Sequence, residues 1–202
     1  MQKLLALTFL FCAFNIFGQS PRVVQLEEVL RNGDVVLTAN GNGDSSGFAV
    51  DGYLKNNTQN RININVKIEN GLYLKNSGRG QNMLAIQIFL SDGGFLSDGR
   101  DYFIIVPAQG SVHVVFNSFC ADFNLNIPLP TESFTVAAMP VGIAGIAYRM
   151  SRYAADAGLG KDSTRALQIA LWRSLGLKRE EIMRKFHFVN EQWELSEIIM
   201  FF

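Results

Sequence analysis

The sequence has little cysteine and little histidine, with two residues of each in 202. Cys12 lies in an apolar stretch near the start of the chain, which leaves Cys120 as the only thiol of the part that we expect to fold. A disulfide within that part is therefore excluded, and packing must hold the fold together. Two histidines are also too few for a multi-histidine metal site in one chain.

An excess of charge is missing as well, since Lys plus Arg and Asp plus Glu both number 18. The chain thus has no basic field that would attract phosphate backbones or anionic lipid, and nucleic acid is not expected as a partner. The sequence contains no phosphate-binding P-loop, no dinucleotide fingerprint after a strand and no GxSxG motif. We predict that the protein is not an enzyme and uses no cofactor.

The chain opens with MQKLLALTFLFCAFNIFGQS, in which one lysine precedes an apolar run and the small residue Gly18 follows it. This order is typical of a signal peptide, and the apolar run is too short to span a bilayer. We predict a cleaved signal peptide at residues 1–19 and no transmembrane segment. The protein would then be secreted, periplasmic or displayed at the cell surface.

Strand patterns fill most of the next hundred residues. The clearest is RININVKIE at 61–69, in which apolar and polar residues alternate without exception, as in a strand with one face on a core. Six further segments have strand character and are followed by turn sequences: 34–40, 47–56, 71–76, 82–90, 101–107 and 111–119. Seven short strands at this spacing predict an antiparallel immunoglobulin-like β-sandwich at residues 20–127.

The pattern changes at Pro128. The segment PLPTESFTVAAMP is expected to be extended or a loop, because each proline restricts the residue before it. Helical patterns follow at 141–158 and 162–176, and the remaining residues form one or two short amphipathic helices. We therefore predict a loop plus helical region at 128–202 that packs on the sandwich, so that the protein is mainly β and α+β overall.

Two short motifs concern the lone thiol. The predicted strand at 111–119 ends at Phe119, and Cys120 follows it directly. The segment LQIALW at 167–172 lies in a predicted helix. Together they resemble the motifs of the thioester domains of bacterial surface adhesins, although Leu167 stands where the family's helix motif has threonine. The resemblance implies an internal thioester between Cys120 and Gln168 that a host amine attacks. The supporting motif residues are Phe119, Leu171 and Trp172.

Simpler interpretations of the same residues remain open. Cys120 lies on the same side of its strand as the apolar residues. A free cysteine in such a position is commonly an inert core residue. The helix at 162–176 can also dock its apolar stripe on the β domain without any covalent bond. A third alternative is a cysteine hydrolase that uses Cys120, His187 and Asn190, which would require the thiol to be exposed beside the histidine.

Two polar loops are weak calcium candidates. The first follows part of the spacing of an EF-hand loop but lacks its glycine and its final glutamate. Asparagine and aspartate also tolerate the backbone angles of tight turns, which explains the same residues without a metal. The candidate ligands are Asn40, Asn42 and Asp44 in the first loop, and Asp92, Asp98 and Asp101 in the second.

We predict from these observations a secreted or cell-surface, non-catalytic binding or structural module that acts in adhesion or assembly. Its partner would be a protein or glycan at the cell surface, or further copies of itself. The apolar run IIMFF at 198–202 favours such an interaction, or docks on the protein's own β domain. The alternatives are a covalent adhesin with a Cys–Gln thioester and, third, a cysteine hydrolase.

Overall fold

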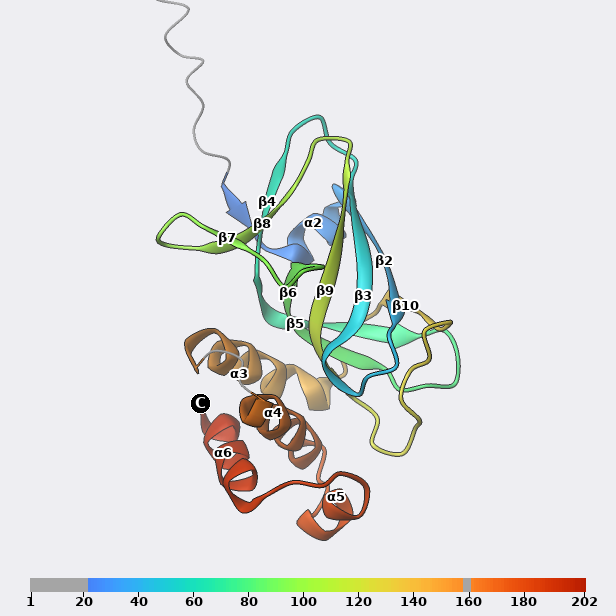
Figure 1. Cartoon of the computed structure of the whole chain (residues 1–202), viewed down its shortest axis with the longest axis vertical. Helices are drawn as coiled ribbons and strands as arrows, with labels where there is room; N and C mark the ends of the chain where they lie inside the picture. The colour runs from blue at the N-terminus through green and yellow to red at the C-terminus, as the bar shows by residue number, and fades with distance from the viewer. Residues whose placement is uncertain (1–21, 158–160) are drawn as a thin grey trace, which may run out of the picture.

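The structure is a computed structural model that describes residues 22–157 and 161–202. The predicted signal peptide lies outside the described residues. Two β-sheets and a group of helices make up the molecule (Figure 1). The elements are β1 Val23–Val24, α2 Leu26–Asn32, β2 Val35–Gly41, β3 Ser46–Asn56, β4 Ile62–Asn65, β5 Lys67–Asn76, β6 Met83–Leu90, β7 Leu96–Ser97, β8 Tyr102–Val106, β9 Ser111–Cys120, β10 Ser133–Val136, α3 Val141–Ala157, α4 Lys161–Ser174, α5 Arg179–Lys185 and α6 Asn190–Phe201.

The main sheet is a closed barrel with the strand order β10-β2-β3-β9-β6-β5. The prediction of an immunoglobulin-like sandwich was therefore wrong, although the fold is mainly β with helices. Alternating strands have the same pattern in a sandwich and in a barrel, because both bury one face of each strand. The strand that closes the barrel, β10, comes from the proline-containing segment that we expected to be extended or a loop.

The segment RININVKIE contributes to both sheets. Its first part, β4, pairs with β8 in a small second sheet of order β1-β4-β8-β7, and its second part begins β5 of the barrel. The chain crosses at Val66, which donates its N–H to Tyr102 O at 2.9 Å and accepts a hydrogen bond from Ile88 N at 2.8 Å. The apolar alternation continues across this crossing, so the sequence reads as one strand.

Strand β10 joins β2 to β5, and Glu132 fixes the chain just before it. The main-chain oxygen of Glu132 accepts a hydrogen bond from Gly41 N at 3.1 Å, at the end of β2. Its carboxylate accepts hydrogen bonds from Asn76 Nδ2, from the N–H groups of Arg79 and Gly80, and from Leu129 N, at 2.9–3.1 Å. One residue thus ties the start of the closing strand to both of its neighbours.

Buried apolar residues form two clusters, one in the barrel and one between barrel and helices. Leu84 and Ile86 of β6 belong to the cluster that also contains residues of α3, α4 and α6, while Met83 and Ile88 belong to the barrel cluster. A register shift between Ala85 and Gln87 interrupts the simple alternation. Both faces of β6 are therefore covered, which explains its continuous apolar sequence. Within 22–157 and 161–202, none of the helices combines the length and apolarity that a membrane crossing requires.

Acid should weaken the closure of the barrel through Glu132. The carboxylate of Glu132 accepts hydrogen bonds from the main-chain N–H of Leu129, from the Asn76 side chain and from the N–H groups of Arg79 and Gly80. These bonds lower the pKa of Glu132 to about 2, from an ordinary value of 4.5. A lowered pKa means that the carboxylate stabilises the fold fully above pH 4.5, and that this contribution disappears as the pH falls towards 2. Thermal unfolding measured between pH 2 and 7 tests this.

For Glu132→Gln we expect a lower melting temperature than the parent at pH 7, and a difference that shrinks as the pH falls from 4.5 to 2. Glu194→Gln is the matched control, because Glu194 is exposed. A Glu132→Gln deficit that stays constant over this pH range would show that the carboxylate charge does not hold β10.

Candidate functional site

The thiol residue lies where the barrel meets the helices. Cys120 ends β9, and α4 places two side chains, one helical turn apart, against its main chain. Gln168 accepts a hydrogen bond from Cys120 N at its Oε1 and donates its Nε2 to Cys120 O, both at 2.9 Å. Trp172 Nε1 donates to the same oxygen at 3.0 Å. The buried carboxamide thus pairs with Cys120 as a neighbouring strand would.

The Cys120 thiol is fully buried and belongs to the barrel cluster. Burial raises the pKa of the thiol to about 12, and the nearby Lys185 ammonium offsets only part of that effect. A thiolate is the reactive form of cysteine, and almost none is present at neutral pH when the pKa is so high. The surroundings of this thiol are those of a core residue.

The structure brings together the two residues of the implied thioester. The Gln168 carboxamide contacts Cys120 through hydrogen bonds to its main chain. The remaining motif residues, Phe119 and Leu171, are buried in the cluster between barrel and helices. Of the hydrolase set, His187 is exposed after α5 and Asn190 accepts a hydrogen bond from Arg179, so neither is seen to engage the buried thiol.

The first calcium candidate loop uses its side chains to form a turn. Asn42 Oδ1 accepts a hydrogen bond from Asp44 N at 3.0 Å, and Asn42 Nδ2 donates to Phe48 O. Asn40 lies within β2 and pairs with Asp51 of β3. The Asn42 oxygen therefore faces the backbone of the loop in the way that asparagine and aspartate stabilise turns.

The second loop is similar. Asp92 accepts a hydrogen bond from Gly94 N at 2.8 Å. Asp98 accepts from Arg100 N and Asp101 N, both at 2.9 Å, and these bonds lower the pKa of Asp98. The described ranges contain no group of three or more His, Cys, Asp and Glu residues placed to hold a metal ion.

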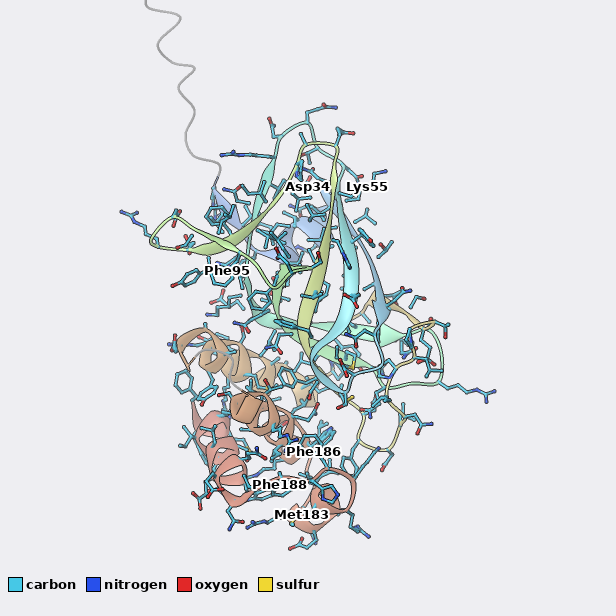
Figure 2. The ribbon with its side chains drawn as sticks, in the orientation of Figure 1. Asp34, Lys55, Phe95, Met183, Phe186 and Phe188 are labelled. Carbon is cyan, nitrogen blue, oxygen red and sulfur yellow. The ribbon has the colours of Figure 1, made fainter. Side chains whose placement is uncertain are left out.

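A cluster of aromatic side chains surrounds a cavity of about 400 Å³, which we call the aromatic hollow. Phe48 and Phe89 come from the barrel, and Phe95 and Tyr102 come from the β7–β8 region, where Figure 2 shows Phe95 above α3. Neighbouring rings meet at centroid distances of 5.2–6.0 Å and mostly edge to face. The full lining is Phe48, Asn65, Val66, Lys67, Gln87, Phe89, Phe95, Tyr102, Ala154 and Ala155.

Three polar side chains lie among these rings. Gln87 is buried; it accepts a hydrogen bond from Asn117 Nδ2 at 3.1 Å and donates to Ala154 O of α3 at 3.5 Å. Asn65 Oδ1 accepts from Lys67 N at 2.9 Å, which leaves the Asn65 amide NH₂ available as a donor. The Lys67 ammonium lies 4.0 Å from Glu69. The hollow therefore combines apolar walls with hydrogen-bond donors at one side.

Sequence reasoning missed the aromatic hollow. Its members come from segments far apart in the chain, and Phe95 and Tyr102 flank a glycine-containing turn region that reads as an ordinary loop. No spacing rule joins Phe48 to Phe95, because the chain passes between the barrel and the second sheet several times, as at Val66. Large aromatic residues within turn-rich segments were the one available signal.

Comparisons of the chain with protein-family models, with curated proteins and with solved structures found no match.

Replacing Gln168 should destabilise the protein without changing its fold. For Gln168→Leu we expect a loss of about 1–3 kcal/mol in the free energy of unfolding, since buried main-chain groups of Cys120 lose a partner. Urea unfolding followed by circular dichroism measures this loss. Gln59→Leu is the control, because Gln59 is exposed and should change stability by less than about 0.5 kcal/mol. Equal effects of the two substitutions would contradict the pairing.

The thiol should be free but protected. In the folded protein, produced without residues 1–19, we expect iodoacetamide to leave Cys120 unmodified at neutral pH, and to label it after unfolding in urea. The intact mass should equal the calculated mass, with no change after incubation with methylamine. A mass lower by one ammonia, with methylamine incorporated, would instead establish the thioester.

Proposed function

We propose that this chain is an exported, non-catalytic binding module that captures an apolar side chain of a protein partner in the aromatic hollow. The proposal of export rests on the signal-peptide pattern at residues 1–19. The proposal of binding rests on one observation, which is that three large aromatic side chains remain solvent-exposed around a single cavity. The exposed fractions are 46% for Phe48, 47% for Phe95 and 57% for Tyr102.

Exposed aromatic groups that gather around a cavity favour a binding site, because scattered single residues would create no continuous apolar surface. A cavity of this size, with apolar walls and a few polar groups, suits one large side chain. The Asn65 amide and the Lys67 ammonium would bind a carbonyl or carboxylate group beside that side chain. The lining therefore favours a large apolar side chain of a protein partner that has a carbonyl or carboxylate oxygen close to that side chain.

A protein side chain fits this site better than a sugar ring. Phe48 meets Phe89 at 72°, and Phe95 meets Tyr102 at 85°, so neighbouring rings lie edge to face and do not form one flat surface. A sugar ring would need a flat, open aromatic face on which to stack. The hollow also depends on the helices, since Ala154 and Ala155 of α3 form part of its wall.

The covalent alternative stays a prediction that the mass measurement tests. The contact between Gln168 and the Cys120 main chain supports a structural role for the motif, in which it fixes α4 on the barrel.

The site can be tested by NMR titration of the mature protein with N-acetyl-L-tryptophan. We expect chemical-shift changes at Phe48, Asn65, Lys67 and Phe95, and weaker binding of N-acetyl-L-tryptophanamide, which lacks the carboxylate. Phe95→Ala together with Tyr102→Ala should remove the response. Tyr53→Ala is the control, because Tyr53 is 54% exposed and stacks on His113 outside the hollow.

Shift changes that map elsewhere, or that persist in the double variant, would overturn the proposal. A response to cellohexaose or chitohexaose at the same residues, with none to the tryptophan derivatives, would assign the hollow to glycans instead.

A further inference from the structure

The barrel is closed along only part of β2. Strand β10 pairs with β2 at two positions, Ser133 with Asn40 and Phe134 with Ala39. It then follows β5 as far as Val136, while Val35–Thr38 of β2 pair with β3 alone. We call the space between Val35–Thr38 and the β10–β5 pair the β2 gap. It coincides with a cavity of about 500 Å³ beside α2.

Main-chain groups of β2 face this gap. In an antiparallel strand, alternate residues direct both N–H and C=O to the same side. Gly41 N donates to Glu132 O on the β10 side, whereas Asp34 O accepts from Asn57 N on the β3 side. Val35 and Leu37 share the parity of Gly41. Their main-chain groups therefore point towards the gap, beyond the end of the ladder with β10. Val35 is only 1% exposed, so Leu37, which is half-buried, is the residue of this edge that a docked strand can reach.

The walls and rim of the gap suit apolar side chains. Leu30 of α2 and Leu72 of β5 line the cavity, and Val36 and Val136 are exposed at its rim. An open strand edge with apolar surroundings is a site at which another strand can add, and natural proteins usually cover or charge such edges. The stretch Val35–Thr38, which β10 does not pair with, would lie beside a segment of about four residues, roughly 13 Å long.

Glu27 of α2 supplies charge selectivity. Its side chain lines the gap, and its Oε1 accepts a weak hydrogen bond from Asn70 N at 3.4 Å. Its Oε2 is buried and has no hydrogen-bond partner among the described residues. Burial also raises the pKa of Glu27. The Arg31 side chain lines the same cavity and acts to lower the pKa of Glu27, but among the described residues it forms no ion pair with Glu27. An incoming cationic group would therefore still stabilise Glu27 Oε2, since a buried charge without a partner is costly.

We propose that the β2 gap docks an extended strand of a partner protein, which adds to the free edge of β2 and places a lysine or arginine against Glu27. The strand would donate to and accept from the main chain of Leu37, and its apolar side chains would pack on Leu30 and Leu72. The gap shares no lining residue with the aromatic hollow, so this proposal is independent of the proposed function.

The free edge can be measured by amide hydrogen exchange in the full mature protein. We expect the amide of Leu37 to exchange much faster than those of Val36 and Thr38, which face β3. Protection of Leu37 equal to that of Ala39 would show that the edge is already paired, and would overturn the proposal.

Docking can be tested with two synthetic peptides, acetyl-VKVTV-amide and acetyl-VEVTV-amide, titrated by NMR. The lysine peptide should shift and protect the amide of Leu37, and should bind about tenfold more tightly than the glutamate peptide. Glu27→Gln should remove most of that preference, whereas Glu28→Gln, on the same helix, should keep it.

Leu37→Pro removes one edge N–H that does not face β3, and should abolish binding of the lysine peptide while circular dichroism still shows a folded protein. Equal binding of both peptides, shifts that map away from β2, or no binding at millimolar concentration would each overturn the proposal. If Leu37→Pro unfolds the chain, the Glu27→Gln comparison decides the question.

Discussion

The pairing of Gln168 with the main chain of Cys120 connects the two halves of the molecule. Two hydrogen bonds of 2.9 Å and a third from Trp172 fix α4 at the end of β9. The Trp172 ring then contacts Phe123 at 5.0 Å and Phe186 at 5.4 Å, which holds the segment after α5, where Figure 2 labels Phe186. The helical region docks on the barrel through main-chain recognition as well as apolar packing.

This docking also shapes the proposed binding surface. Helix α3 packs beside α4 on β5 and β6, and its Ala154 both accepts a hydrogen bond from Gln87 and lines the aromatic hollow. The hollow exists because the crossing at Val66 brings the second sheet to the same side of the barrel. A site built from two sheets and a helix is more rigid than one on a single loop, and rigidity reduces the entropy that binding costs.

The sequence could predict the elements better than their closure. Alternation located most strands, and periodicity placed the helices at 141–158 and 162–176 close to α3 and α4. Strands of a barrel and of a sandwich show the same alternation. The barrel is recognised by its closing strand β10, which follows Pro130. The motif LQIALW led to the contact between Cys120 and Gln168, but it could not say whether the carboxamide meets the thiol or the main chain. The aromatic hollow and Glu132 depend on contacts between distant segments, which no local pattern encodes.

The most direct test of the account concerns the atom at which Gln168 meets Cys120. A long-range HNCO experiment on the labelled mature protein detects coupling across a hydrogen bond from the Cys120 amide nitrogen to the side-chain carbonyl carbon of Gln168. We expect a cross-peak between these nuclei, with the carbon at the chemical shift of a primary carboxamide. No cross-peak, together with a carbon shifted to the thioester range, would contradict the structural role of this pairing and favour the covalent adhesin.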